Sequence, residues 1–398
     1  MEIYRAAKTL LKGPICDHCL GRQFAALLTG MANEERGRAI RLTLAMEYEA
    51  KPFKLDVDNF HGIGLRKSLK TKGKECRVCN NIFAKLAGLA GQAAGQLKGV
   101  EFATFLVGTK LSGTLVAKEE SLWEETGINH CESIRAEINR VVGKLLEKQL
   151  GKKFSRDNPE VNVTLDLELM KAQVSVMPLF VYGKYKKLVR GIPQTKWDKY
   201  QETVEDVIAG PFMPASKGKG HAMHAAGRED IDARCLDYRP FVFQVDQPQK
   251  RSLDLAKLAK LVNQSGKVEV SQLRRSDRAE VRKVKKLRPD KTYRLLVSFA
   301  KPVTGLAALA KLKGTISQKT PTRVMHRRAD LLRKRKVKGI KVRKLAGNRI
   351  EVEVRCEAGL YAKELMTGDN GRTKPSAAEL LGNPAKVEEL DVIKIWLK

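Results

Sequence analysis

Two pairs of cysteines have the spacing of metal ligands. They are Cys16-x-x-Cys19 in ICDHCLGRQF and Cys76-x-x-Cys79 in ECRVCNNIF. Each tight Cys-x-x-Cys turn presents two sulfurs to one ion, and two such turns supply the four thiolates of a tetrahedral zinc site. We predict a structural zinc ion bound by Cys16, Cys19, Cys76 and Cys79, which would pin the start of the chain to a distant turn. The alternatives are unrelated buried thiols or a redox pair.

An acidic cluster is the second feature whose residue types could do chemistry. The segment GREDIDAR places Glu229, Asp230 and Asp232 directly before RPFVFQV, which has the pattern of a strand. A solvated acidic turn is the ordinary explanation, because Gly and Asp clusters usually mark loops. A carboxylate reserved for catalysis is the other explanation, and the rest of the chain decides between them.

The composition indicates a folded, strongly cationic protein. The 398 residues include 76 Lys and Arg against 45 Asp and Glu, which gives a net charge of +31, and 42% are hydrophobic. A chain of this length is expected to form two or three domains. Such a charge favours a polyanionic partner, with nucleic acid ahead of an anionic membrane. No signal peptide or long apolar segment is evident, so we expect a cytoplasmic protein without a membrane partner.

Helical and strand patterns alternate along the chain. Helices are predicted over 31–50, 83–100, 131–154 and 253–264, and strands over 102–111, 161–191, 239–245 and 349–365. The stretch GPFMPASKGKG contains two prolines and several glycines, so we place a domain boundary near residue 205. The order of elements predicts an α+β fold with domains at 1–205 and 206–398.

Aromatic and basic residues mix in the segment VYGKYKKLVRGIPQTKWDKY. Tyr185 and Trp197 interleave there with cations that include Lys187, Arg190 and Lys196. Aromatic rings stack on bases while cations contact phosphates, so this segment is predicted to bind RNA. The alternative is a plain strand with a solvated cationic face.

A longer basic block and the missing nucleotide loops also bear on function. Residues 322–344 contain eleven Lys or Arg and one acid, Asp330, and can grip a phosphate backbone. No glycine-rich loop has the spacing and context of a nucleotide site. We therefore expect no nucleotide or other organic cofactor.

Three segments in chain order resemble the active-site motifs of pseudouridine synthases. They are GREDIDAR, KTYRLLVSF and GLYAKELMTGDNGRTKPS. Together with the cysteine pairs, RGIPQTKW, QKTPTRVMHRRADL and GDNGRTKPSAAELLG, they make nearly the whole chain resemble the archaeal Pus ten family of tRNA pseudouridine synthases. The resemblance implies a zinc-binding, THUMP-containing, tRNA-binding domain over 1–205. It also implies a catalytic domain over 206–398 with a mixed, mostly antiparallel sheet.

The resemblance also implies roles for single residues. Asp230 is the nucleophile, attacking either C1′ of the ribose or C6 of the base once the uridine has left its stack. Lys363 pairs with Asp230, and Tyr293 packs near the base and moves the proton from C5. The residues expected to bind RNA or to support the site floor are Arg228, Arg323, His326, Arg327, Arg328 and Arg372. Ala362 stands where the family usually carries a branched aliphatic residue, so this chain departs from the family pattern there with a smaller side chain.

The expected substrate is tRNA, with uridine 54, uridine 55 or both isomerised in the TΨC arm, and we expect a monomer. One alternative is a non-catalytic tRNA-binding or tRNA-folding protein built on the same fold. A different THUMP-bearing tRNA enzyme is the other, although the missing cofactor loop weighs against it.

Overall fold

The computed structural model describes residues 2–66 and 70–397, without the side chains of Glu2 and Arg327. The chain divides into two compact units, Met1–Met177 and Pro178–Lys398. The predicted boundary at residue 205 therefore lies inside the second unit. Strand β5 (Leu179–Lys187) pairs with β7 (Ala233–Asp246) and β8 (Val268–Ser276), which ties it to the second unit. The Pro- and Gly-rich stretch that suggested the boundary is mostly helix, α7 (Val204–Ser216).

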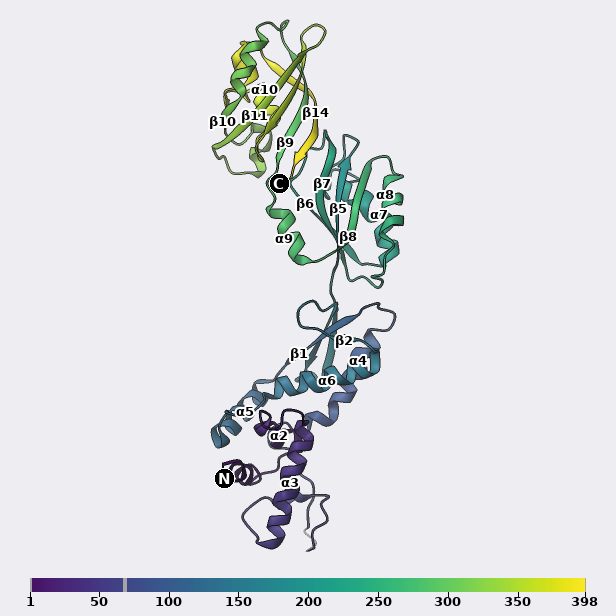
Figure 1. Cartoon of the computed structure of the whole chain (residues 1–398), viewed down its shortest axis with the longest axis vertical. Helices are drawn as coiled ribbons and strands as arrows, with labels where there is room; N and C mark the ends of the chain where they lie inside the picture. The colour runs from purple at the N-terminus through teal and green to yellow at the C-terminus, as the bar shows by residue number, and fades with distance from the viewer. Residues whose placement is uncertain (1, 67–69, 398) are drawn as a thin grey trace. The chain divides into compact units, whose positions relative to one another are not determined.

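The first unit combines helices with a small sheet (Figure 1). Its helices are α1 (Glu2–Leu10), α2 (Asp17–Gly21), α3 (Asn33–Ala50), α4 (Leu86–Gln96), α5 (Gly113–Thr126) and α6 (Ile134–Leu150), with 3₁₀ turns η1 (Arg22–Phe24), η2 (Val57–Phe60) and η3 (Ile82–Lys85). The strands β1 (Thr104–Lys110), β2 (Lys153–Phe154), β3 (Val161–Asp166) and β4 (Lys171–Val176) are ordered β2-β1-β3-β4. The predicted helices over 31–50, 83–100 and 131–154 are confirmed as α3, α4 and α6.

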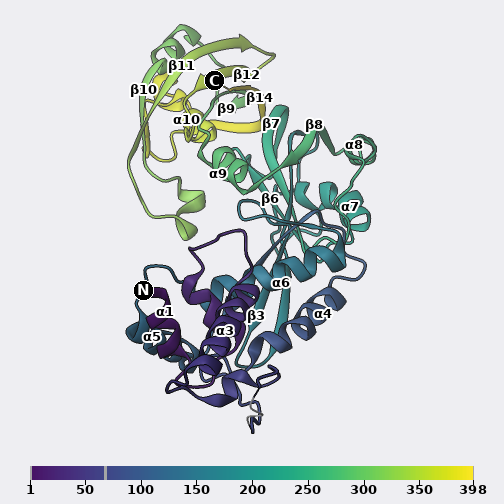
Figure 2. The same cartoon turned by 60° about the horizontal axis from the view of Figure 1, so that its bottom comes forward.

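Helices α4 and α6 lie side by side, α4 against β4 and α6 against β1 (Figure 2). Helix α6 begins at an N-cap, because the Ser133 hydroxyl accepts a hydrogen bond from the amide of Ala136. At the other end of the unit α2 packs closely on α3. A Cβ at Gly21 or Gly37 would lie within 2 Å of a backbone oxygen of the facing segment. The two glycines therefore allow the first cysteine turn to rest directly on α3.

The second unit is built on a ten-stranded sheet, ordered β13-β10-β11-β12-β9-β14-β7-β5-β8 with β6 paired to β7. Besides β5, β7 and β8, its strands are β6 (Gly220–Ala225), β9 (Asp290–Phe299), β10 (Gly314–Gln318), β11 (Arg333–Lys344), β12 (Arg349–Cys356), β13 (Thr373–Lys374) and β14 (Ala385–Trp396). Among the described strands of this sheet, β7 and β14 are parallel and the other pairs are antiparallel. This confirms the predicted α+β class with a mixed, mostly antiparallel sheet.

Helices cover both faces of this sheet. They are α7, α8 (Leu255–Asn263), α9 (Arg278–Lys286), α10 (Ala362–Thr367) and α11 (Ala377–Leu381), with 3₁₀ turns η4 (Leu306–Leu312) and η5 (Thr322–Arg327). Apolar residues of α7 and α8 form one core with β5 to β8, while α9 packs on the other face. Of the two strands predicted over 349–365, the first is confirmed as β12 and the second is wrong. Strand β12 ends at Cys356, and the chain then enters α10.

The register of three strands brings distant motifs together. Val392 of β14 pairs with Cys235 of β7 on one side and with Tyr293 of β9 on the other. The acidic segment that precedes β7 therefore lies beside Tyr293. The loop from β12 to α10 brings Lys363 to the same place, since α10 contacts both β9 and β14.

Candidate active site

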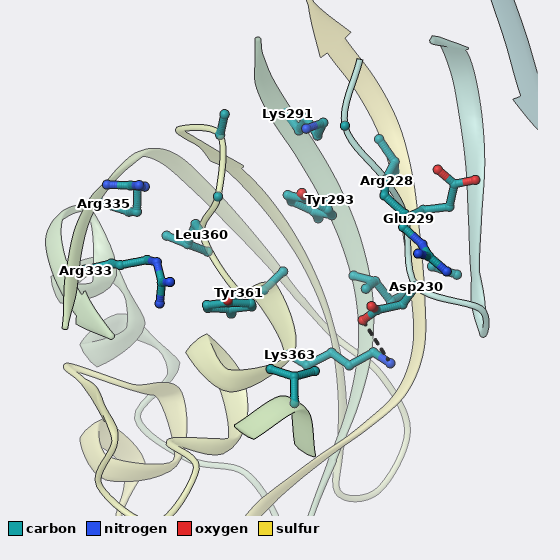
Figure 3. A pocket seen from close by; sticks show the side chains of 18 of the residues that line it. Arg228, Glu229, Asp230, Lys291, Tyr293, Arg333, Arg335, Leu360, Tyr361 and Lys363 are labelled. Carbon is teal, nitrogen blue, oxygen red and sulfur yellow. Dashed lines mark ion pairs between the residues drawn. The ribbon is translucent and has the colours of Figure 1, made fainter. Parts of the chain in front are cut away.

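A cavity of about 490 Å³ opens where these strands meet. Asp230, Tyr293 and Lys363, one from each of the three motifs, line it (Figure 3). Leu360, Tyr361 and the buried Ala362 are among the apolar residues of its wall. The structure thus brings together residues that are more than 130 positions apart in the chain.

Asp230 lies between two cations. The nearest oxygen of its carboxylate is 3.6 Å from the Lys363 ammonium and 3.1 Å from the Arg323 guanidinium, and the side chain is 34% exposed. These two ion pairs hold the Asp230 carboxylate in place while the side chain still faces the cavity.

The Lys363 ammonium is closer to a second carboxylate. It donates hydrogen bonds of 2.8 and 2.6 Å to the two carboxylate oxygens of Asp232. Burial opposes ionisation of Asp232, but these bonds hold its pKa below the usual value. Lys363 therefore bridges both aspartates of the GREDIDAR segment.

Arg323 lies beside Asp230, whereas the sequence indicated only an RNA contact for it. Its guanidinium donates from Nε to the buried Glu364 at 2.7 Å and reaches Asp230 through another nitrogen. Burial opposes the charge of Arg323, but its bonds to Glu364 and Asp230 leave the pKa raised. Sequence reasoning missed Glu364 because only the fold makes a glutamate beside Lys363 a partner for residue 323.

Tyr293 enters the cavity from β9. Burial raises the pKa of its phenol well above the usual value, so the hydroxyl keeps its proton at neutral pH. A neutral phenol can pack against a flat base and exchange a proton with it. The structure places Tyr293 in the cavity, and its role in moving the proton from C5 stays a prediction.

Lys291 also lines the cavity and carries a perturbed charge. Burial, with a smaller contribution from Arg239, lowers its pKa from 10.5 to about 8. In the unfolded chain Lys291 would bind its proton up to about pH 10.5, so between pH 8 and 10.5 the unfolded state holds more protons. Stability of the wild type should therefore rise with pH in this window.

We predict that Lys291→Met removes this rise. At pH 7 the variant should be more stable by about 3–4 kcal/mol, because the pKa falls from 10.5 to about 8 and one pKa unit corresponds to about 1.4 kcal/mol. The difference should shrink as pH increases from 8 to 10.5, and urea unfolding at pH 7 and pH 10 measures it. An equal pH slope in both proteins would contradict this prediction.

Two residues predicted to bind RNA are instead buried. Tyr185 is fully buried, and its hydroxyl donates to the Glu229 carboxylate at 3.0 Å. Lys187 is also fully buried. Both belong to β5, whose odd-numbered residues face inward, so neither side chain can contact RNA. The prediction is wrong for both residues.

Two arginines that were predicted to bind RNA form ion pairs and hydrogen bonds within the fold. Arg190 pairs with Asp391 at 2.7 Å and with Glu389 at 2.8 Å. Arg372 donates to the carbonyl of Thr320 at 2.9 Å and pairs with Asp330. Both guanidinium groups are thus engaged within the fold.

The other predicted RNA-binding residues are nearer to solvent. Lys196 and His326 are exposed, and the side chain of Arg327 lies outside the described part of the structure. Arg328 is exposed and donates to the Tyr361 hydroxyl at 3.1 Å. Arg228 lines the main cavity and also a second cavity of about 450 Å³, which shares Asp230, Arg323 and Arg328 with the first.

The second cavity has an aromatic corner. Trp197 and Tyr200 line it, with ring centroids 5.5 Å apart and planes tilted by 44°. Aromatic rings beside cations form the surface on which unstacked bases bind. Asp230 therefore lines both the main cavity, which is rich in cations, and the second cavity with its aromatic corner.

The four paired cysteines of the first unit converge. Their sulfurs lie within 4.8 Å of one another, with Cys16 and Cys79 at 3.6 Å, and Cys19, Cys76 and Cys79 are buried. Tetrahedral metal–sulfur bonds of about 2.3 Å place sulfurs about 3.8 Å apart, which this cluster fits. Burial raises the pKa of the Cys19 thiol, so a thiolate there requires a cation. Cys16, Cys19, Cys76 and Cys79 could hold a metal ion.

A family profile described as "Pus10, C-terminal" matches residues 180–396, and one described as "Pus10 THUMP domain, archaeal" matches residues 89–166. These matches, with the mixed sheet and the site at its seam, define a THUMP-containing protein with a pseudouridine synthase-like fold. No described helix is long and apolar enough to cross a membrane.

Curated relatives agree with these profiles. A protein of Methanothrix thermoacetophila named tRNA pseudouridine synthase Pus10 is 42% identical, covering 99% of this chain and 94% of the relative. A protein of Thermofilum pendens with the same name is 38% identical, covering 98% and 95%. The chain belongs to the Pus10 family and is an enzyme of the isomerase class.

Solved structures give a weaker likeness. A crystal structure of a Cbf5-Nop10-Gar1 complex covers 53% of this chain and 48% of its own, with 19% identity and a TM-score of 0.33. This degree of likeness adds nothing to the assignment of the family.

Proposed function

We propose that this protein isomerises uridine to pseudouridine in the TΨC arm of tRNA, at position 54, position 55 or both. The observation that carries the proposal is the placement of Asp230 between Lys363 and Arg323 on the wall of a cavity. The cavity, of about 490 Å³, can admit a nucleotide that has been flipped out of its stack. A protein that only binds RNA needs no carboxylate held at such a place.

The reaction conserves atoms and electrons. The bond from C1′ to N1 breaks, a bond from C1′ to C5 forms, C5 loses a proton and N1 gains one. Asp230 acts as the nucleophile, and Lys363 and Arg323 orient its carboxylate through ion pairs. Tyr293 packs against the base, and its hydroxyl passes on its own proton as it takes up the proton from C5. No redox or organic cofactor is required.

The positive charges that line the cavity can bind the phosphates on either side of the flipped nucleotide. Eight cations line it against two carboxylates, Glu229 and Asp230. The cations are Arg228, Arg288, Lys291, Arg323, Arg328, Arg333, Arg335 and Lys363. Such an excess of positive charge draws in an anionic backbone and positions it without reading its sequence.

The first unit would hold another part of the tRNA. Its four cysteines would bind a structural zinc ion, the metal that favours a closed four-thiolate site. Because one chain carries both the binding and the catalytic parts, we expect it to act as a monomer in the cytoplasm, without a nucleotide cofactor.

The position of modification can be tested with three tRNA transcripts. One is unmodified, and the other two carry cytidine in place of uridine 54 or uridine 55. Carbodiimide-blocked primer extension should show stops at 54, 55 or both in the first, and each replacement should remove only its own stop. Binding without any stop, across several tRNAs, would favour a non-catalytic tRNA-binding protein instead.

We predict that Trp197→Ala weakens substrate binding. A base stacked on an aromatic ring contributes about 1–3 kcal/mol, so KM should rise about 5- to 150-fold while kcat changes little. Single-turnover kinetics over a range of tRNA concentrations separates the two constants.

A matched substrate and a control variant sharpen this test. An abasic nucleotide beside the target uridine should raise KM for the wild type but have little further effect on Trp197→Ala. Tyr200→Phe keeps an aromatic ring in the second cavity and should retain the wild-type KM. If Trp197→Ala leaves KM unchanged, the aromatic corner does not bind the RNA.

A further inference from the structure

Lys187, the last residue of β5, is a fully buried lysine whose ammonium group is bound by backbone carbonyls. The ammonium donates to the carbonyl of Ile192 at 2.7 Å, of Ile231 at 2.9 Å and of Asp230 at 3.2 Å. A lysine ammonium has three N–H donors, so this arrangement uses all of them. Two of the three acceptors belong to the turn that carries the proposed nucleophile.

The strand pattern explains why Lys187 reaches this turn. Residues of β5 alternate strictly between buried and half-buried, which sends Lys187 inward and Lys186 to the other face. Lys187 pairs with Cys235 of β7, after a register shift that follows Tyr185. The buried ammonium therefore lies behind the start of β7. There the turn formed by residues 227–232, which we call the catalytic turn, ends.

Residues that follow Lys187 in the chain donate hydrogen bonds to the same turn. The amide of Gly191 donates to the carbonyl of Ile231 at 2.9 Å, and the Gln194 side chain donates to the carbonyl of Gly227 at 3.0 Å. Gly227 has a φ of +82°, a conformation that favours glycine, and so allows the turn to begin there. Segment 185–194 thus forms a support behind residues 227–232.

Glu229 is fixed from the same side. Its carboxylate accepts hydrogen bonds from the Tyr185 hydroxyl and pairs with the fully buried Arg239 at 3.1 Å. With Glu229 drawn inward, the following residue points the other way, into the cavity. The sequence indicated only that Glu229 belongs to the acidic cluster around Asp230. The structure shows which residues hold the Glu229 carboxylate.

A buried ammonium is costly unless its hydrogen bonds are made. Burial lowers the pKa of Lys187, although the nearby carboxylates of Glu229, Asp232 and Asp230 partly oppose this effect. A methionine of similar length would avoid the cost of burying a charge and still fill the space. The presence of a lysine at this position therefore points to a role other than packing.

We propose that Lys187 is a positioning residue, which fixes the backbone of the catalytic turn so that Asp230 faces the target nucleotide. The proposal rests on the function proposed above, with Asp230 as nucleophile. Lys187 does not touch the cavity, so its effect should appear in the rate of the chemical step and not in the binding of tRNA. A misplacement of about 1 Å at a reacting group can cost about 100-fold in rate.

The test compares Lys187→Met with Lys260→Met in the full-length protein. Lys260 is the matched control, since it makes the same change at an exposed position of α8, outside the segments predicted to bind RNA. Loss of the Lys187 ammonium should leave the fold intact, because two of its three acceptors keep a backbone donor, Gly191 for Ile231 and Ala233 for Asp230. Thermal unfolding, tRNA affinity and the single-turnover rate are measured for each variant.

Lys187→Met should lower the single-turnover rate about 30- to 100-fold with less than a threefold change in Kd for tRNA. Lys260→Met should match the wild type in both. Lys187→Arg keeps the charge but cannot direct a planar guanidinium at all three carbonyls, so its rate should lie between those of the wild type and Lys187→Met. If Lys187→Met fails to fold, Lys187→Arg carries the test, and a lower rate at unchanged Kd is still expected.

Several results would overturn the proposal. A folded Lys187→Met with the wild-type rate would show that the turn needs no such support, and so would a loss seen only in Kd. Asp230→Asn, measured in parallel, separates the two proposals. If Asp230→Asn stays active the proposed nucleophile is wrong, whereas an inactive Asp230→Asn beside a fully active Lys187→Met rejects only the positioning role.

Discussion

Replacing Asp230 with asparagine should abolish pseudouridine formation while leaving tRNA bound. Asparagine has the size of aspartate but cannot form the covalent intermediate, so the rate should fall at least about 10⁴-fold, as when other covalent nucleophiles are removed. Binding should persist because the cations that line the cavity remain. Nucleoside analysis of digested tRNA under single-turnover conditions measures the rate, and filter binding measures Kd.

Asp157→Asn makes the same chemical change on an exposed segment of the first unit and is the control. It should convert tRNA at the wild-type rate. Conversion by Asp230→Asn within tenfold of the wild type would show that another group attacks the substrate.

Removing the zinc ion proposed for the four-cysteine cluster should produce the largest change in stability. Cys19, Cys76 and Cys79 belong to the hydrophobic core of the first unit, and the cluster joins α2 to a turn near residue 76. Structural zinc contributes about 10–16 kcal/mol of binding energy in small domains, which exceeds the stability of most domains. Chelation should therefore unfold the first unit, and calorimetry should show one transition shifted far downward.

A cysteine variant and a control complete this experiment. Cys19→Ser should lose the metal and reproduce the effect of the chelator, with one zinc per chain measured in the wild type. Cys131→Ser changes a cysteine outside the cluster and should keep both metal and Tm. Metal-free protein with an unchanged calorimetric trace would contradict the predicted role of the cluster.

The chemistry-bearing motifs could be predicted from the sequence because their chemistry restricts local spacing. Two neighbouring cysteine sulfurs reach one ion only from a tight turn, so the spacing of Cys16 and Cys19 predicts that both are metal ligands. Asp230 was indicated by its setting in GREDIDAR. Its pairing with Lys363 was implied by the family motif, and the register of β7, β14 and β9 and the loop into α10 explain how the two meet.

Other features could not be predicted because they depend on which way a strand faces. In a basic chain, Tyr185 and Lys187 look like RNA contacts, and only the pairing of β5 with β7 and β8 turns them inward. Arg323 appeared to be one cation among many, and its bonds to Asp230 and Glu364 exist only in the folded protein. The domain boundary was misplaced because packing of α7 overrides the helix-breaking tendency of Pro211 and Pro214.

The most direct test of the account maps pseudouridine in an unmodified tRNA transcript treated with wild type or Asp230→Asn, with binding measured in parallel. Carbodiimide-dependent stops at uridine 54, uridine 55 or both should appear with the wild type. The same stops should be absent with the variant at equal tRNA affinity. Binding by both proteins with stops from neither, across several tRNAs, would contradict the assignment of Asp230 as the nucleophile of a tRNA pseudouridine synthase.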